Sequence, residues 1–342
     1  MLSAFDGDKQ LVWDATSLST YMKGGPFEYT LAILHGFRRP LTLVPLWGTL
    51  FHEGMQLLEV TRAKGDLSDA AFLSIVKHLS ARAIEESFPS LWVYAPRTQR
   101  RLRTFTMIIW LLRQRWREWQ HRAPDYKLVI TRGLPGIEVN LSRPIGNGRH
   151  LCGYLDGVYV TDIPTLGEVM SFVDFKSKKG YHNDHAVESF RRTIQFMLYA
   201  WMGADLAAEQ GLLWDGIWLT AVWIPEVTGD SKRAISPPKI ITNYLRYGQH
   251  ELSTFIRNAH YWIDRAHRDW QDGLLTLDSV INTPIWNEAC ITMYDRQNEA
   301  PNAFAALALL PPRLRAEALE TNFVRQGRWD PLAARNVTLI GE

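Results

Sequence analysis

Residues 153–158 read Gly-Tyr-Leu-Asp-Gly-Val, and residues 173–177 read Val-Asp-Phe-Lys-Ser. Side chains alternate between the two faces of a strand, so Asp174 and Lys176 would share one face of the second segment. The residues around this pair are apolar, and an acid and a base are costly to bury there unless they are paired or bind a metal ion. An isolated Asp-x-Lys pattern is typical of a solvated sheet face. The apolar setting instead favours a functional site over a buried ion pair.

Asp156 lies in the first of these segments, eighteen positions before Asp174. That separation suits two adjacent antiparallel strands joined by a loop at residues 164–167. Both carboxylates could then converge on one divalent cation, and Lys176 could reach the attacking water or the scissile phosphate. Phosphodiester hydrolysis needs an activated water and stabilised phosphoryl charge, which one or two metal ions and a nearby ammonium group supply. The flanking residues Gly153 and Gly157 would permit close approach of a substrate backbone.

The pattern around these segments predicts an α/β fold, with a mixed sheet flanked by helices and a helical N-terminal region. Apolar residues recur at helical spacing through most of the first 125 residues. After them come short segments that are rich in β-branched residues or alternate between apolar and polar residues, as strands do. The strands of that part, up to residue 175, are expected to form a meander. Helices are predicted at 31–37, 46–60, 70–88, 97–122, 185–209 and 248–270, and strands at 127–131, 136–141, 151–160, 169–175, 214–224 and 239–244.

The composition is that of a soluble globular protein, with 46% hydrophobic residues and 14 tryptophans. A net charge of +2 means that any affinity for nucleic acid must come from local patches. The longest apolar runs, at 104–112 and 303–310, are shorter than the ~18 residues of a membrane span, and the charged N-terminus does not resemble a signal peptide. Only Cys152 and Cys290 are present, which suits a reducing compartment. We therefore expect a cytoplasmic protein without a membrane partner.

One strongly basic segment allows two interpretations. Residues 97–122 contain eight arginines and a single acid, Glu118, with Trp110, Trp116 and Trp119 between them. The segment could follow a phosphate backbone and stack bases on its tryptophans. It could equally be an exposed helix whose tryptophans face the core.

A second group of basic residues follows the Asp-x-Lys segment directly. We expect Lys178 and Lys179, with His182 and His185, to leave the site on a flexible loop and to contact nucleic acid. Arg191 and Arg192 would extend this contact.

Residues 153–158 and 173–177 together resemble the core of the PD-(D/E)XK nuclease superfamily, specifically its RecB-like, phage-type exonuclease branch. The resemblance implies a restriction-endonuclease-like core and a metal-dependent nuclease. It also implies catalytic roles for Asp156, Asp174 and Lys176. The metal ligands would include both aspartates and the backbone carbonyl of Phe175.

Three further features of that branch have counterparts here. Residues 48–53 read Gly-Thr-Leu-Phe-His-Glu, and the resemblance implies that His52 is a metal ligand. Gln195 and Tyr199 match a Gln-x-x-x-Tyr pair on one helix face, which would bind a DNA phosphate or the metal shell. Glu138 stands in the expected strand before Asp156 and would have a supporting role.

The N-terminal segment extends the resemblance. Residues 17–21 read Ser-Leu-Ser-Thr-Tyr and residues 25–29 read Gly-Pro-Phe-Glu-Tyr, similar to the opening pattern of the branch. Relatives with an iron–sulfur cluster have a cysteine where this chain has Gly25. Because a cubane cluster needs four thiolate ligands and the chain has two cysteines, we expect no iron–sulfur cluster.

These features predict a metal-dependent DNA nuclease, most simply an exonuclease or end-processing enzyme of recombination, repair or phage DNA metabolism. The alternatives are an endonuclease of a restriction or defence system and, with less support, a non-catalytic nucleic-acid-binding module. Mg²⁺ or Mn²⁺ would serve, and an imidazole ligand shifts the preference towards Mn²⁺.

The expected partners and organisation follow from the same interpretation. The substrate would be DNA, in the cytoplasm of a bacterium or phage-infected host. The sequence has no phosphate-binding loop of the Gly-x-x-x-x-Gly-Lys-Ser/Thr type, so a helicase, or a recombination or annealing protein, would be a separate partner. We expect a nuclease domain over residues 1–273, with its core at about 125–245. Residues 274–342 would be an extension packed on it.

Overall fold

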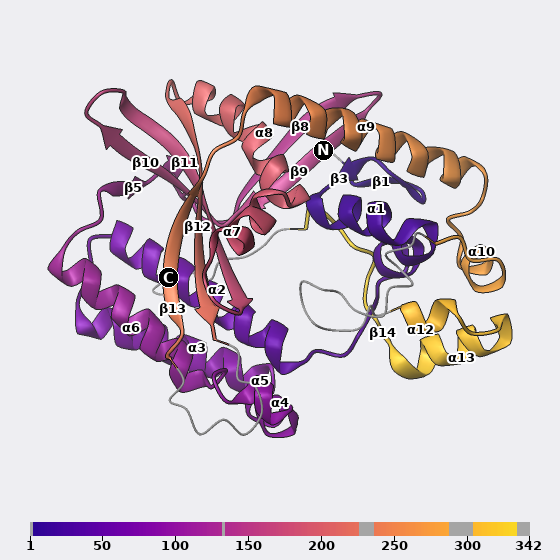
Figure 1. The fold of residues 1–342 in the computed structure, drawn as a ribbon, viewed down its shortest axis with the longest axis horizontal. Coiled ribbons are helices and arrows are strands. Elements are labelled where there is room, and N and C mark those ends of the chain that lie inside the picture. The colour runs from indigo at the N-terminus through magenta and orange to yellow at the C-terminus, as the bar shows by residue number, and fades with distance from the viewer. Residues whose placement is uncertain (1–2, 132–133, 226–235, 287–303, 334–342) are drawn as a thin grey trace.

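The computed structural model describes residues 3–131, 134–225, 236–286 and 304–333 of the chain. A mixed five-stranded sheet lies at its centre, formed by β5 (Tyr126–Leu128), β10 (Gly157–Ile163), β11 (Gly167–Lys179), β12 (Leu213–Ile224) and β13 (Lys239–Leu245). The strand order is β13-β12-β11-β10-β5 (Figure 1). β11 and β12 run parallel, and the other neighbours run antiparallel.

A second, three-stranded sheet lies beside the first. It has the order β3-β9-β8, made by β3 (Val12–Trp13), β9 (Arg149–Leu155) and β8 (Val139–Gly146). Three short antiparallel pairs complete the strands: β1 (Phe5–Asp6) with β2 (Lys9–Gln10), β4 (Phe37–Arg38) with β14 (Val324–Arg325), and β6 (Ile130–Thr131) with β7 (Leu134–Pro135).

Helices cover both faces of the central sheet (Figure 1). One layer contains α2 (Leu43–Ala63), α3 (Asp69–Glu85), α4 (Phe88–Tyr94), α5 (Arg97–Arg100) and α6 (Phe105–His121). The other side contains α1 (Ala15–Tyr29), the π-helix η1 (Thr30–Leu34), α7 (Asp184–Arg191), α8 (Ile194–Glu209), α9 (Gln249–Gln271), α10 (Leu277–Asn282), α12 (Ala305–Ala308) and α13 (Pro312–Asn322). The prediction of an α/β fold with a mixed sheet between helices is confirmed.

The alternation of side chains along β11 divides the molecule into two cores. Val173 and Phe175 belong to the core shared with α2, α3 and α6. Phe172 belongs to the core shared with α1, α8 and α9. Because period-two alternation also fixes the residues between them, Asp174 and Lys176 point towards the α8 side of the sheet.

The C-terminal part contributes to the same core as α1 and α8. Phe304, Leu307 and Leu319 are buried in that cluster. The predicted division at residue 273 stays a prediction. No helix among the described residues is both long enough and apolar enough to cross a membrane.

The structure corrects the predicted strand at 151–160 and the meander built on it. The chain leaves the small sheet after β9, passes through Asp156 and enters the central sheet as β10. Two local contacts fix this break. The Asp156 side chain accepts the backbone N–H of Phe175, and Gly157 lies so close to Val173 that an added Cβ would be 2.5 Å from Cγ1.

Two predicted helices are interrupted, and a third is mostly replaced. The segment 97–122 divides into α5 and α6 because Thr104 caps α6, its Oγ1 accepting the N–H of Met107. The segment 185–209 divides into α7 and α8, where Thr193 caps α8. The residues at 31–37 form part of η1 and the start of β4 instead of an α-helix.

Candidate active site

Asp156 occupies the junction between the two sheets and is 3% exposed. Its Oδ2 atom accepts the backbone N–H of Phe175 at 2.7 Å. The same oxygen lies 3.0 Å from Nε2 of His52. The junction therefore holds one carboxylate between a strand backbone and a helical imidazole.

His52 reaches this carboxylate because α2 packs closely on β11. Gly48 lies one turn before His52, on the same face of the helix. A Cβ at Gly48 would lie 3.0 Å from Oγ of Ser177, so a larger residue would push the helix away from the strand. The His52 ring packs 5.8 Å from the ring of Phe175, measured between centroids. The glycine of the Gly-x-x-x-His motif thus lets α2 pack closely on β11, and this packing brings His52 to Asp156.

Glu138 joins the same cluster, although not from a strand as predicted. It has a left-handed backbone conformation, φ 50°, in the bend before β8. Gln56, one turn after His52, lies 3.1 Å from Nε2 of His52 and donates to Oε1 of Glu138 at 2.5 Å. Donor atoms of His52, Glu138 and Asp156 all lie within 4.8 Å of one another. The residue expected to be supporting is therefore one of three convergent candidate ligands.

A second polar cluster surrounds Asp174, which is completely buried. The Nζ atom of Lys176 lies 3.1 Å from Oδ1 and 2.9 Å from Oδ2 of Asp174. Gln195 donates from Nε2 to Oδ1 of Asp174 at 3.0 Å. The same amide lies 3.0 Å from the hydroxyl of Tyr199, which donates to the carbonyl of Tyr154 at 2.5 Å. The predicted Gln-x-x-x-Tyr pair thus connects β11 to β9.

The electrostatic environments of the two aspartates differ. Burial raises the pKa of Asp174 to about 7, against the opposing charge of Lys176 and with the help of Asp156. Burial would also raise the pKa of Asp156, but the charges of His52 and Lys176 outweigh it and lower that pKa below 3.8. Burial opposes protonation of His52, yet Asp156 raises its pKa above 6.5. Neighbouring carboxylates with opposite shifts are typical of functional sites.

The donor set fits a divalent cation. One imidazole and two carboxylates converge, and Gln56 orients two of them, as outer groups do around metal ligands. Asp174 is not in that group, and its carboxylate contacts Lys176 and Gln195. Its role as a ligand, and that of the Phe175 carbonyl, stay predictions.

The predicted nucleic-acid contacts are placed differently from expectation. Lys178 and Lys179 are the last residues of β11, so they do not lie on a flexible loop, and Lys178 Nζ lies 5.5 Å from the centre of the Phe190 ring. The strand extends further than expected because β12 pairs with it up to Lys179.

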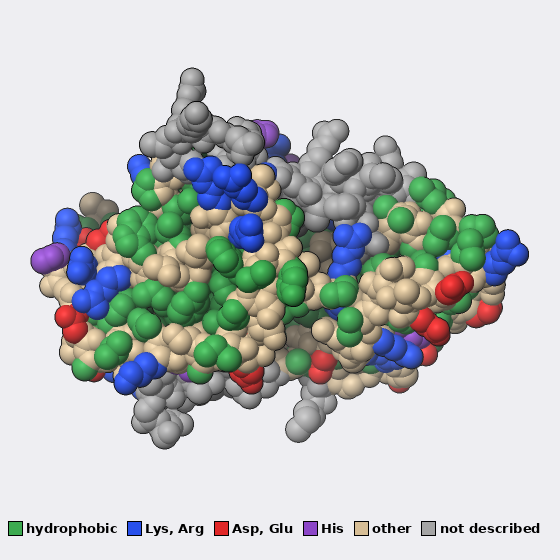
Figure 2. Space-filling view, turned by 90° about the horizontal axis from the view of Figure 1, so that it is seen from below, with side chains coloured by type: hydrophobic (Ala, Val, Ile, Leu, Met, Phe, Trp, Pro, Cys, Tyr) green, Lys and Arg blue, Asp and Glu red, His purple; other side chains and the backbone are tan. Residues whose placement is uncertain are grey.

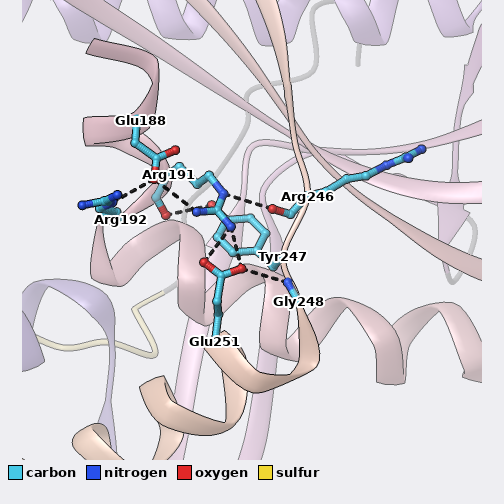
Figure 3. Close-up of polar contacts among 7 residues, drawn as sticks. All are labelled: Glu188, Arg191, Arg192, Arg246, Tyr247, Gly248 and Glu251. Carbon is cyan, nitrogen blue, oxygen red and sulfur yellow. Dashed lines mark hydrogen bonds and ion pairs between the residues drawn. The ribbon is translucent and has the colours of Figure 1, made fainter. Parts of the chain in front are cut away.

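Arg191 and Arg192 have separate environments (Figure 3). Arg191 forms ion pairs with Glu188 and Glu251 and donates to the carbonyl of Arg246. Its guanidinium also lies 5.1 Å from the centre of the Tyr247 ring. The Arg192 side chain is 74% exposed and pairs with Glu188. Arg191 is thus a structural connection between α7 and α9, whereas Arg192 faces solvent.

The two interpretations of the basic segment are separated by burial. Trp116 and Trp119 are buried in the core beneath α6, and Trp110 is 38% exposed. Figure 2 shows the side of the molecule that is the lower one in Figure 1, where α3 to α6 lie. Hydrophobic side chains cover much of this side, and basic side chains form separate groups on it. The structure therefore favours the helix whose tryptophans face the core.

Gln56 is a site residue that the sequence motifs do not include, and the two flanking glycines pack against protein side chains. A Cβ at Gly153 would lie 2.7 Å from Cε1 of Tyr199, and Gly157 faces Val173. Both glycines leave room for neighbouring protein side chains. The sequence signal for Gln56 is its position one turn after His52.

The N-terminal motif, residues 17–21 and 25–29, lies within α1. Asp14 caps the helix by accepting the N–H of Ser17 at 2.8 Å, and the hydroxyl of Tyr21 donates to the buried Asp269. The kink of the helix falls at Gly25, φ 65°, where Pro26 follows. Cys152 is buried, and Cys290 lies outside the described residues.

The sequence profile of the PD-(D/E)XK nuclease superfamily matches residues 13–235. That range begins just before α1 and includes both polar clusters. No curated protein matches the chain significantly.

Proposed function

The chain belongs to the PD-(D/E)XK nuclease superfamily, and we propose that it is a metal-dependent deoxyribonuclease that processes DNA ends. The observation that carries this proposal is the pairing of two polar clusters, each around a buried aspartate, at one junction. His52, Glu138 and Asp156 offer convergent donor atoms, and Asp174 lies next to them with its own ammonium partner, Lys176. The combination matches the needs of phosphodiester hydrolysis.

The residues that would hold the cation are His52, Asp156 and Glu138, with Asp174 as a further carboxylate. A bound divalent cation would activate water and stabilise charge on the phosphoryl oxygens. Mg²⁺ prefers sites that have oxygen ligands alone, whereas the imidazole of His52 favours Mn²⁺. We therefore propose that both ions support activity and that Mn²⁺ supports more.

The remaining site residues act on the substrate and on one another. Lys176 carries an ammonium group beside Asp174, and this charge offsets negative charge on a phosphate placed over β11. Gln195 and Tyr199 hold Asp174 and the backbone of β9 in fixed positions. Preorganised donors of this kind need little rearrangement during the reaction.

We propose a role in recombination, repair or phage DNA metabolism because the motifs resemble the RecB-like branch. A separate helicase or annealing protein would act with the chain. The branch, the pathway and these partners rest on the sequence resemblance alone.

The test is cleavage of end-labelled linear DNA with Mg²⁺, with Mn²⁺ and with EDTA, beside covalently closed circular DNA and labelled RNA. We expect metal-dependent release of label from linear DNA and sparing of the circle. Cleavage of the circle would instead support an endonuclease of a defence system. Cleavage of RNA alone would contradict the DNA assignment, and the absence of any cleavage would contradict the proposed function.

A further inference from the structure

A cavity of about 670 Å³ lies beside the proposed active site. One wall is the start of α1 up to Lys23, and the other is the corner between α7 and α8. Gly153 and Tyr154 of β9 also line it. We call this cavity the strand groove.

The strand groove is continuous with the active site. Gln195 and Tyr199 line the groove, and Gln195 also donates to the carboxylate of Asp174. A chain of linked phosphates that places one phosphate over Lys176 would therefore reach the groove within the next nucleotides. The groove lies on the α8 side of the sheet, the side towards which Asp174 and Lys176 point.

The lining of the strand groove suits a phosphate backbone. Lys23 carries positive charge, as does the largely exposed Arg192, which also pairs with Glu188, and Thr16 and Thr193 carry hydroxyl groups. Phosphate oxygens are commonly bound by such cations and hydroxyls. The lining thus offers both cations and hydroxyl groups to a phosphate.

The two acids of the groove are already engaged by other groups. Asp14 accepts the N–H and the hydroxyl of Ser17, and its Oδ2 accepts the indole N–H of Trp329 at 3.0 Å. Glu188 pairs with Arg191 and Arg192. These partners reduce the repulsion that the carboxylates would exert on a phosphate.

The α7 wall is held in place by the Arg191 network. Arg191 connects Glu188 of this wall to Glu251 at the start of α9, and Tyr247 donates its hydroxyl to the Arg191 carbonyl (Figure 3). Glu251 in turn accepts the N–H of Gly248 at 2.9 Å. A preformed wall lowers the cost of ordering a bound ligand.

We propose that the strand groove binds a single nucleic-acid strand, one or two nucleotides at a time, next to the scissile phosphate. This inference rests on the proposed nuclease function and adds the form of substrate that enters the site. A volume of about 670 Å³ is that of a pocket for a small molecule, whereas a duplex, with grooves alone ~6–12 Å wide, is far too large to enter. A strand of a linear duplex would therefore enter only from an end whose base pairs have opened, whereas a closed circle offers no such end.

The test is binding of a fluorescein-labelled eight-nucleotide thymidine strand in EDTA, so that no cleavage occurs. The variant K23A/R192A removes both groove cations, and Thr16→Trp fills the groove from an exposed position on α1. The control variant K64A/R257A removes two exposed cations elsewhere. A blunt duplex of the same strand length serves as the second probe.

We expect K23A/R192A and Thr16→Trp each to weaken single-strand binding about tenfold or more, with the control within twofold of the unmodified protein. The slope of log affinity against log salt should fall by about 1.4 in K23A/R192A, since each single-strand phosphate contact contributes ~0.7. Duplex binding should change little.

Two outcomes would overturn the inference. Unchanged single-strand binding in both groove variants would show that the strand lies elsewhere, and equal losses for strand and duplex would show that the groove does not select a single strand. Because binding is measured without metal, neither outcome depends on activity. A protein that binds the strand through the groove but cleaves nothing would contradict the nuclease function alone.

Discussion

The imidazole of His52 and the carboxylate of Asp156 contact each other at 3.0 Å, although one comes from a long helix and the other from the junction between two sheets. The same carboxylate oxygen accepts the N–H of Phe175. One atom therefore connects α2, β11 and the β9–β10 junction. Such a geometry requires the whole fold, and it orders the candidate metal ligands before any substrate arrives.

The first prediction concerns the two charged residues of the Asp-x-Lys pattern, Asp174 and Lys176. Asp174→Ala and Lys176→Ala should each lower the DNA cleavage rate about a hundredfold or more, because they remove a carboxylate and an ammonium group of the reacting site. Single-strand binding in EDTA should stay within a few-fold of the unmodified protein. Asp162→Asn, at an exposed position of β10, is the matched control. Normal cleavage by both site variants would show that the site is assigned wrongly.

The second prediction concerns the pH dependence of metal binding. Cation binding needs a neutral His52, and a charged Asp174 beside the site favours it. Because burial raises the pKa of Asp174 to about 7 and Asp156 raises that of His52, both groups hold protons at mildly acidic pH. Mn²⁺ should therefore bind more tightly at pH 8 than at pH 6 and should release protons. Calorimetry in buffers of different ionisation enthalpy measures both quantities, and the same affinity at both pH values with no proton release would contradict this prediction.

The third prediction concerns a buried carboxylate outside the site. Glu59 is 1% exposed and accepts the hydroxyls of Tyr126 at 2.9 Å and Tyr159 at 2.6 Å. Its other oxygen pairs with Arg62 at 2.9 Å. Glu59→Ala leaves these groups without their acceptor, so the free energy of unfolding should fall by about 3–5 kcal/mol. Urea denaturation measures it.

The control for this change is Glu85→Ala. Glu85 is 68% exposed and pairs with Arg82 on the surface of α3. Its loss should change the free energy of unfolding by less than about 1 kcal/mol. Similar effects for the two variants would show that the Glu59 cluster adds nothing to stability.

The fourth prediction separates the two neighbouring arginines. Arg191→Ala should lower the free energy of unfolding by about 1–3 kcal/mol, since it removes the charged partner of Glu251 and Glu188. Arg192→Ala should leave stability nearly unchanged and weaken single-strand binding. Thermal denaturation and fluorescence anisotropy measure the two effects. Equal losses of stability in both variants would contradict the division of roles.

The sequence could predict those parts of the fold that depend on local periodicity. The apolar spacing at residues 46–60 and 70–88 matches α2 and α3, and the alternation at 169–175 lies within β11. The break at Asp156 could not be predicted in this way. It depends on a hydrogen bond to the backbone of another strand, and a run of apolar residues on either side gives no sign of it.

The site residues divide in the same way into those that a sequence motif identifies and those whose position depends on the tertiary fold. The motifs predict a site of Asp156, Asp174, Lys176 and His52. The structure places His52 beside Asp156 and Lys176 beside Asp174, and their roles stay predictions. Glu138 was assigned to a strand because a left-handed backbone conformation at a glutamate leaves no sequence signal.

The tryptophans of α6 could have been placed from the sequence. Leu112, Trp116 and Trp119 recur at helical spacing and so lie on one buried face. Trp110 lies off that face and is partly exposed. The density of arginines in the segment supports a nucleic-acid surface equally well, and only the apolar spacing separates the two interpretations.

The most direct test of the metal site is an anomalous difference map from crystals soaked with Mn²⁺. We predict a peak at bonding distance from Nε2 of His52 and from the Asp156 carboxylate, with Glu138 or Asp174 completing the protein ligands. Asp156→Asn crystals treated in the same way should lose the peak. A map whose Mn²⁺ peaks all lie away from His52 and Asp156, in crystals of protein that cleaves DNA with Mn²⁺, would contradict the account.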